Sequence, residues 1–234
     1  MIADINGITY PLYIQRGALN DLGSKIKESF PQSKVVIISD EKVFSLYGKK
    51  AVECIKKEGL TVNSIVVKQG EQSKSLDVLK HVFDKLIEYE TIRTDVIVAL
   101  GGGVVGDLTG FAASCYLRGV KYIQVPTSLL AQVDSSIGGK TAVNLKQGKN
   151  LVGSFYHPSM VIIDSDALET LDDVNFACGM AEVIKTALIL DKDLFEVLKK
   201  YSSRSLIQPI ISDIITAFCK NKLQVVQQYE KDTG

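Results

Sequence analysis

The sequence predicts an α/β fold, in which a domain with a mostly parallel sheet is followed by an all-α domain. Two observations favour this class. From about residue 33 to residue 125, short apolar runs alternate with stretches of helical periodicity, as in strands joined by crossover helices. After Asp164 the runs rich in Val and Ile give way to helical stretches. We therefore expect an α/β domain over residues 1–165 and a helical domain over residues 166–234.

Four apolar runs are the expected strands of this sheet. Each is rich in Val and Ile and lacks alternation with polar residues, as strands buried on both faces should. They lie at Val35–Ser39, Val62–Val67, Val96–Leu100 and Tyr122–Val125. Apolar character on both faces indicates a parallel sheet that is covered by helices.

Helical periodicity fills the intervals between these strands. Apolar residues at i, i+3 and i+4, with charges on the other face, are typical of crossover helices. Such stretches lie at Glu41–Lys57, Leu76–Tyr89 and Leu108–Tyr116, and further ones follow at about 176–190, 193–201 and 206–229.

The bulk composition excludes several classes of partner. The 27 basic and 27 acidic residues cancel, and no cluster of Lys and Arg marks a nucleic-acid surface. The four cysteines are far apart without a C-x-x-C pair, which indicates reduced thiols rather than a disulfide framework. No apolar run reaches the roughly 18 residues of a membrane span. We expect a cytoplasmic protein that binds a small molecule, and neither nucleic acid nor a membrane.

A glycine-rich turn follows the third predicted strand. Gly101, Gly103 and Gly106 fit the pattern G-x-G-x-x-G at a strand's carboxyl end. Glycine lets the backbone approach a pyrophosphate, and the free N–H groups of a helix N-terminus favour negative charge. The turn therefore predicts a Rossmann-like site for a dinucleotide, although a purely structural turn fits the same pattern.

The position of this turn differs from the usual dinucleotide fold. There the turn follows the first strand, and an acidic residue about 20 positions further on binds the ribose. Here no carboxylate stands at that spacing, which disfavours a plain dehydrogenase. Asp40 ends the first predicted strand at the same sheet edge, so it is the candidate ribose ligand. A helix N-cap at Asp40 is equally consistent.

Three further polar segments are candidates for a site. Glu71 and Lys74 follow the second strand and could bracket a hydroxylated group, or belong to a loop that caps the next helix. The small, glycine-containing segment 131–144 makes a poor helix and a poor strand, which suggests a site. Cations and amides suited to a phosphate or carboxylate occur in and around it, at Arg118, Lys140, Lys149 and Asn150, with Asp134 as a carboxylate. Solvated surface lysines are the alternative.

Glu182 and Lys185 stand three residues apart in a helical stretch. They therefore share one face, beside small and apolar residues. The two side chains could form a surface ion pair. A carboxylate at Glu182 could instead ligate a metal.

Five linked motifs together closely resemble 3-dehydroquinate synthases, in order and over nearly the whole chain. They are GEQSKS at 70–75, GGGVVGDLTGFAAS at 101–114, the segment 118–144 with VPTSLLAQVDSSIGGKTAVN, GKNLVGSFYHP at 148–158 and GMAEVIK at 179–185. The wider superfamily includes glycerol dehydrogenases and iron-dependent alcohol dehydrogenases, whose turn is similar to G-G-G-S-x-x-D-x-x-K. Val104 and Gly110 replace that serine and lysine, so the synthase branch fits better.

The resemblance implies the conversion of 3-deoxy-D-arabino-heptulosonate 7-phosphate to 3-dehydroquinate, in the shikimate pathway of aromatic amino-acid biosynthesis. It also implies catalytic NAD and a divalent metal, zinc or cobalt. In that family NAD oxidises a ring hydroxyl, phosphate leaves, and the NADH just formed reduces the ketone before an aldol step closes the carbocycle. The enzyme class implied is a lyase.

The resemblance also assigns residues. Positions similar to NAD contacts are Asp40, Glu71, Lys74, Gly103, Val104, Val105, Gly106, Asp107, Thr127 and Ser128. Lys140 and Lys149 match cofactor and substrate positions, and Asn150 and Arg118 match phosphate ligands, with Arg118 reaching across from a partner subunit of an expected homodimer. Asp134 and Lys185 match substrate contacts, Lys185 for the carboxylate, and Glu182 matches the metal-ligating glutamate.

One departure from the family concerns the metal. Its other two ligands are histidines in a later segment, whereas the histidines here are His81 and His157, at neither ligand position. Because a catalytic zinc takes about three protein ligands, we expect a truncated synthase that binds NAD but turns over little or not at all. A related cyclase such as 2-deoxy-scyllo-inosose synthase, or a non-catalytic NAD-binding remnant, are the alternatives.

Overall fold

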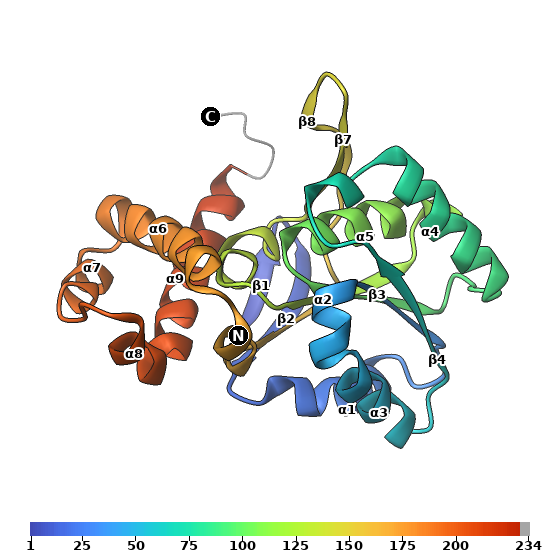
Figure 1. The fold of residues 1–234 in the computed structure, drawn as a ribbon, viewed down its shortest axis with the longest axis horizontal. Helices are drawn as coiled ribbons and strands as arrows, with labels where there is room; N and C mark the ends of the chain where they lie inside the picture. Colours follow the sequence, from blue (N-terminus) through green and yellow to red (C-terminus); the bar gives the residue numbers. More distant parts are fainter. Residues whose placement is uncertain (230–234) are drawn as a thin grey trace.

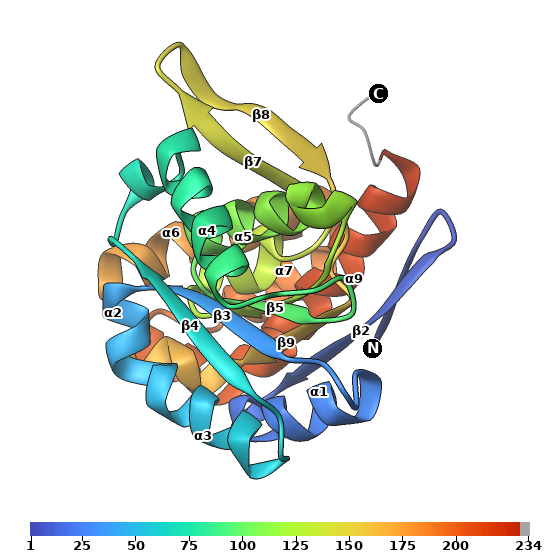
Figure 2. The same ribbon diagram turned by 90° about the vertical axis from the view of Figure 1, so that its right-hand side faces the viewer.

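The computed structural model describes residues 1–229, and a seven-stranded sheet lies at its centre (Figures 1 and 2). The strand order is β1-β2-β9-β6-β5-β3-β4. The antiparallel pair β1–β2 stands at one edge, and the other pairings are parallel. The strands are β1 (Ile2–Ile5), β2 (Ile8–Gln15), β3 (Val35–Asp40), β4 (Val62–Val67), β5 (Val96–Gly101), β6 (Lys121–Pro126) and β9 (Met160–Asp164). The predicted mostly parallel sheet is confirmed.

Helices cover both faces of this sheet, which explains the uninterrupted apolar runs. On one face Leu22, Ile26 and Ile55 pack against β3, β5 and β6. On the other face Leu79, Val82 and Leu108 pack against β3, β4 and β5. The covering elements are η1 (Ala18–Asp21), α1 (Leu22–Ser29), α2 (Glu41–Val43), the π-helical turn η2 (Phe44–Gly48), α3 (Lys49–Lys57), α4 (Leu76–Glu88), α5 (Gly103–Cys115) and η4 (Tyr116–Arg118).

Two local expectations were wrong. Helix α5 begins at Gly103 rather than at Leu108, because Gly102 already has the extended backbone of an N-cap. The segment 131–144 does form a strand: after the π-helical turn η5 (Ala131–Ser135), β7 (Lys140–Leu145) pairs with β8 (Gly148–Phe155) in a separate hairpin that projects from the body (Figures 1 and 2). Pairing with β8 and burial of Val143 stabilise a strand that local composition does not favour.

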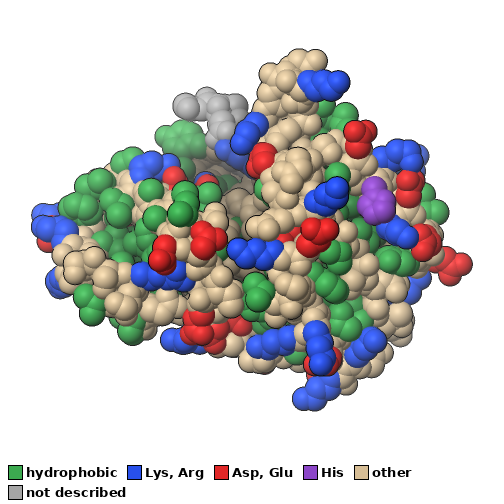
Figure 3. Space-filling view, viewed as in Figure 1, with side chains coloured by type: hydrophobic (Ala, Val, Ile, Leu, Met, Phe, Trp, Pro, Cys, Tyr) green, Lys and Arg blue, Asp and Glu red, His purple; other side chains and the backbone are tan. Residues whose placement is uncertain are grey.

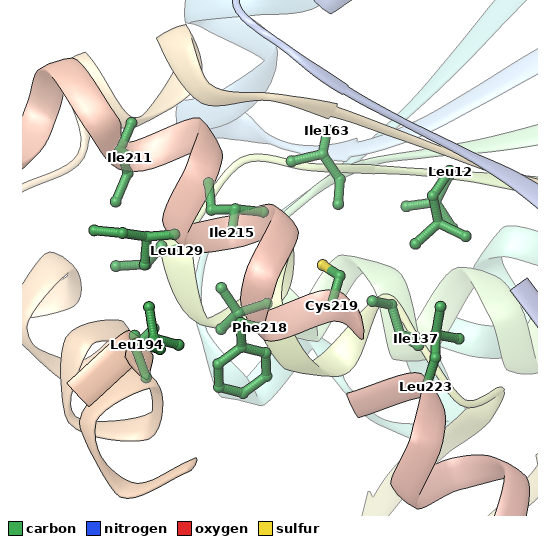
Figure 4. Packing of buried hydrophobic residues seen from close by; sticks show 14 of the residues in the cluster. Leu12, Leu129, Ile137, Ile163, Leu194, Ile211, Ile215, Phe218, Cys219 and Leu223 are labelled. Atoms are coloured by element: carbon green, nitrogen blue, oxygen red, sulfur yellow. The ribbon is translucent and has the colours of Figure 1, made fainter. Parts of the chain in front are cut away.

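The C-terminal region is helical, as predicted. It comprises η6 (Ser165–Thr170), α6 (Asp173–Leu190), α7 (Lys192–Leu198), α8 (Arg204–Ile207), η7 (Gln208–Ile210) and α9 (Ile211–Gln228). Its apolar residues share one cluster with β1, β2 and β9, in which Cys219 of α9 lies toward Leu12 and Ile163 (Figure 4). A domain boundary at residue 165 stays a prediction. Within residues 1–229, no helix has both the length and the apolar character to cross a membrane.

Candidate functional site

The candidate site is a cavity of about 560 Å³ at the carboxyl edge of the central strands. The space-filling view shows this face hollowed between the helical region on the left and the α/β region on the right (Figure 3). Segments far apart in sequence line the cavity: 40–47, 69–74, 102–107, 127–135, 149–150 and 170–178. In a parallel sheet the loops after the strands meet at one edge, so the fold brings these segments together.

The glycine turn forms the floor of this cavity at the start of α5. Gly102 has no side chain with which to cap the helix, so the first N–H groups of α5 stay available to a ligand. A Cβ on Gly103 would stand 3.1 Å from Ser135 Oγ, and one on Gly102 would stand 3.3 Å from Ser128 Oγ. Bare backbone N–H groups at a helix N-terminus are a ready site for a pyrophosphate. These residues fit a dinucleotide.

Two other glycines of the motif serve packing. A Cβ on Gly106 would stand 2.9 Å from Gln124 Oε1, and one on Gly110 would overlap Thr141 of β7. Gly106 therefore lets α5 approach β6, and it does not line the cavity. Gly110, at the position where the wider superfamily has lysine, lets the β7–β8 hairpin rest on α5.

Asp40 ends β3 and is the N-cap of α2. Its Oδ1 accepts a hydrogen bond from the Val43 N–H at 2.9 Å. The prediction of an N-cap at Asp40 is therefore confirmed, and it does not exclude a role for Asp40 as a ribose ligand. A carboxylate has two oxygens, so Asp40, which lines the cavity, can cap the helix and still accept from a hydroxyl.

A polar network around the buried Lys74 links three of the predicted residues. The Lys74 side chain, 6% exposed, donates to Asp107 Oδ2 and to Asn150 Oδ1. Burial raises the pKa of Asp107, and the adjacent Lys74 ammonium opposes that shift. The network joins the segment after β4, helix α5 and the hairpin, so three separate elements fix one cation in the cavity.

Glu71 lies nearer the surface of the same cavity. Its Oε1 accepts from Asn144 Nδ2 at 2.7 Å and lies 3.6 Å from Lys149 Nζ. The hydrogen bond from Asn144, followed by the charges of Lys149 and Lys74, lowers the pKa of Glu71. The capping alternative for this segment belongs to Ser75, which is the N-cap of α4.

Several predicted residues lie outside the lining of this cavity. Asp134 of η5 forms an ion pair with Lys222 of α9 at 2.7 Å. Lys140 begins β7 and is exposed. Arg118 follows the C-terminal end of α5, about 20 Å along that 13-residue helix from the glycine turn. The role of Arg118 in a partner's site stays a prediction.

Glu182 and Lys185 on α6 form the ion pair that their spacing allows. The Lys185 side chain is 59% exposed and that of Glu182 is 25% exposed. Glu182 is thus less buried than its small neighbours suggested. Within residues 1–229, His, Cys, Asp and Glu side chains do not gather into a group of three that could hold a metal ion. A ligand role for Glu182 stays a prediction.

Some cavity residues had no signal in the sequence. Tyr47 lines the cavity, and its hydroxyl donates to the Ala167 carbonyl at 3.1 Å. Lys42 Nζ lies 3.6 Å from Oδ2 of Asp172, the N-cap of α6, and forms an ion pair with it. Asp172 could have been found as a cap before a helical stretch, whereas contacts across 120 or more residues depend on the fold.

Comparisons with known proteins give one consistent family. A model described as 3-dehydroquinate synthase N-terminal matches residues 64–178, and one described as 3-dehydroquinate synthase C-terminal matches residues 179–234. A 3-dehydroquinate synthase of Clostridium botulinum is 47% identical over this whole chain and 67% of its own length. One from Clostridium beijerinckii is 45% identical over the same shares. The chain spans about two thirds of the length of these relatives.

Solved structures of related enzymes share this fold. A 2-deoxy-scyllo-inosose synthase complexed with carbaglucose-6-phosphate, NAD+ and Co2+ is 29% identical, with a TM-score of 0.87 over 97% of this chain and 62% of its own. A 2-epi-5-epi-valiolone synthase from Streptomyces hygroscopicus with NAD+ and Zn2+ bound is 26% identical, with a TM-score of 0.88 over 100% and 65%. A glycerol dehydrogenase from Schizosaccharomyces pombe, 16% identical with a TM-score of 0.71, covers 94% of this chain and 62% of its own and shares the fold.

Proposed function

This chain belongs to the 3-dehydroquinate synthase family, and we propose that it binds NAD and a heptulosonate 7-phosphate at the carboxyl-edge cavity. The reaction proposed is the phosphate-eliminating, carbocycle-forming step that yields 3-dehydroquinate, which makes the enzyme a lyase. The observation that carries this proposal is the meeting of the bare α5 N-terminus with the Lys74–Asp107–Asn150 network in one cavity.

The cavity offers groups that suit the pyrophosphate and a ribose of the cofactor. Bound NAD supplies a hydride acceptor and, once reduced, a hydride donor. The N–H groups at the start of α5 are proposed to bind the pyrophosphate, and Thr127 and Ser128 to extend that cradle. Asp40 is proposed to accept from a ribose hydroxyl with the carboxylate oxygen that does not cap α2.

The chain's cations are proposed to hold the substrate. Lys149 and Asn150 line the cavity from the hairpin and suit a phosphate, for which amide and ammonium groups are good donors. Lys140, Asp134 and Lys185 are proposed to contact the rest of the substrate, with Lys185 on its carboxylate. The ion pair between Asp134 and Lys222 adds Lys222 to the groups near that end of the site.

The proposed metal needs more ligands than we assign among residues 1–229. A catalytic zinc takes about three protein ligands, and Glu182 is the one candidate ligand that we assign among residues 1–229. The described residues therefore do not by themselves fit the metal, and we derive no step through it. We propose only that Glu182 would exchange its contact with Lys185 for the ion.

The subunit arrangement also belongs to the proposal. Arg118 matches a phosphate ligand, yet it lies at the far end of α5 from the cavity of its own chain. We propose that the protein is a homodimer in which Arg118 serves the partner's site. Analytical ultracentrifugation checks this, and a monomer at micromolar concentration would contradict it.

The test of the proposed function combines two measurements on the same sample. NAD binding is measured by isothermal titration calorimetry, and phosphate release is measured from 3-deoxy-D-arabino-heptulosonate 7-phosphate with NAD and Zn2+ or Co2+. NAD binding with NAD-dependent release supports the synthase. NAD binding without release supports a non-catalytic NAD-binding protein. Failure to bind NAD contradicts the proposal.

A related sugar-phosphate cyclase is the second candidate. The 29% identical inosose synthase favours it, because that complex holds a sugar-phosphate analogue together with NAD+. Replacing the heptulosonate by glucose 6-phosphate in the same assay separates the two. Phosphate release from the glucose ester and not from the heptulosonate would favour the cyclase.

A further inference from the structure

The β7–β8 hairpin pairs as a sheet of its own and projects from the body, yet it supplies Lys149 and Asn150 to the cavity (Figures 1 and 2). Its base rests on α5 through Thr141. Nearer the tip, a second attachment is at Asn144. The Asn144 N–H donates to the Lys74 carbonyl at 2.8 Å, and Asn144 forms an isolated bridge with Ser75. Asn144 therefore fastens the hairpin to the segment after β4.

The side chain of Asn144 joins the two sides of the cavity. Its Nδ2 donates to Glu71 Oε1 at 2.7 Å, on the segment after β4. Its Oδ1 accepts from the Asn150 N–H at 2.9 Å, within the hairpin. The Asn144 amide thus donates to Glu71, a proposed cofactor contact, and accepts from Asn150, a proposed phosphate ligand. A carboxylate at this position could only accept.

The contact with Asn144 supports the conformation of Asn150. The φ of Asn150 is 59°, in the left-handed region, which few residues adopt and which asparagine tolerates better than most. The bond from the Asn150 N–H to Asn144 holds the backbone there, while Asn150 Oδ1 accepts from the buried Lys74. Without Asn144, relaxation of the backbone would turn the Asn150 amide away from Lys74.

We propose that Asn144 is a positioning residue that sets Glu71 for the cofactor and Asn150 for the substrate's phosphate at the same time. This inference rests on the proposed function, since the roles of Glu71 and Asn150 belong to it. It adds a residue whose two amide atoms have separable tasks. Donation by Nδ2 serves the cofactor side, and acceptance by Oδ1 serves the phosphate side.

Three variants test this separation, with NAD and inorganic phosphate as the titrated probes. Asn144→Ala removes both tasks, so the affinities for NAD and for phosphate should each fall about tenfold. Asn144→Asp keeps the acceptor for Asn150 but cannot donate to Glu71. It should lose NAD affinity about tenfold and keep phosphate affinity within about threefold. Gln147→Glu, the same amide-to-carboxylate change at the exposed hairpin tip, should change neither.

The outcomes separate this inference from simpler explanations. A purely structural role for Asn144 would lower the melting temperature while leaving both affinities unchanged, and that result would overturn the inference. Equal behaviour of Asn144→Ala and Asn144→Asp would also overturn it. Should Asn144→Ala fail to fold, the comparison of Asn144→Asp with Gln147→Glu decides. Failure of the unsubstituted protein to bind NAD would instead overturn the proposed function.

Discussion

The carboxyl-edge cavity and helix α6 each hold charged residues of the proposed site, but their contacts differ in kind. In the cavity, Lys42, Lys74 and Lys149 each pair with a carboxylate from another segment. On α6, Glu182 and Lys185 pair with each other within one helix turn. Their neighbours include exposed apolar side chains, with Leu188 61% exposed.

This difference separates contacts that require the fold from contacts that require only a helix. The pairs in the cavity join residues 33 or more positions apart, so they exist only when the segments around the sheet edge are in place. The pair on α6 is local, and its lysine is 59% exposed. The cavity is therefore organised before a ligand arrives, whereas Glu182 has only a weak contact to give up.

The largest expected effect is that of Lys74→Met on the free energy of unfolding. Methionine keeps most of the packing of the Lys74 side chain, but it leaves the largely buried Asp107 carboxylate without a cation. Breaking a buried ion pair at one partner typically lowers stability by about 3 kcal/mol. Chemical denaturation measures the change. Lys80→Met is the control, because Lys80 forms an exposed pair with Asp84 on the neighbouring α4, and it should change stability by less than about 0.5 kcal/mol.

The pH dependence of the Lys74→Met variant tests the contribution of the same ion pair. Burial raises the pKa of Asp107 above its ordinary value of 3.8, and Lys74 opposes this shift. With Lys74 gone, the folded-state pKa rises further. The stability of the variant relative to the unsubstituted protein should then fall as pH rises from 3.8 through the folded-state pKa of Asp107. Below pH 3.8 the deficit should be small, because the Asp107 carboxyl is protonated in both the folded and the unfolded state. Denaturation at a series of pH values checks this, and a deficit that grows toward acid pH would contradict it.

A smaller effect is expected on the reactivity of cysteines. Cys178 is exposed and lines the cavity, whereas Cys115 is exposed at the C-terminal end of α5, away from the cavity. Cys219 is buried, and burial raises the pKa of its thiol to about 12. Because thiolates react with iodoacetamide, Cys115 and Cys178 should be labelled quickly and Cys219 slowly. Saturating NAD should slow the labelling of Cys178 several-fold and leave Cys115, the internal control, unchanged. Peptide mass spectrometry measures both rates, and equal protection of the two would contradict the placement of NAD.

The smallest effect is expected on α6. Lys185→Met removes the partner of Glu182, but Lys185 is 59% exposed, and exposed pairs contribute about 0–1 kcal/mol. We expect a change in unfolding free energy below about 0.5 kcal/mol, measured beside Lys74→Met. A loss as large as that of Lys74→Met would break the contrast between the two regions.

The sequence predicts the features that depend on short-range patterns. Uninterrupted runs such as Val96–Leu100 mark the strands, and the glycine pattern at Gly101–Gly106 marks the turn that we propose to bind the cofactor, because burial on both faces and helix capping leave local signatures. The Glu182–Lys185 pair follows from spacing alone. The family resemblance supplies the candidate site residues, and the cavity brings Asp40, Lys74 and Asp107 together.

The features that sequence reasoning missed depend on distant contacts. Strand β7 looked unfavourable because its stability comes from pairing with β8 and from Gly110 beneath it. The partner of Asp134 is Lys222, 88 positions later, and Asn144 acquires two tasks only when the hairpin meets the segment after β4. Composition within a short window contains none of this information.

We propose that the cavity formed by residues 1–229 binds NAD without a metal. Titration of the EDTA-treated protein with NAD checks this, with Gly103→Val as the variant whose side chain would fill the space beside Ser135. We predict saturable binding in EDTA, unchanged by added Zn2+, and at least tenfold weaker in Gly103→Val at a similar melting temperature. Binding that requires Zn2+, or that Gly103→Val leaves unchanged, would contradict the account.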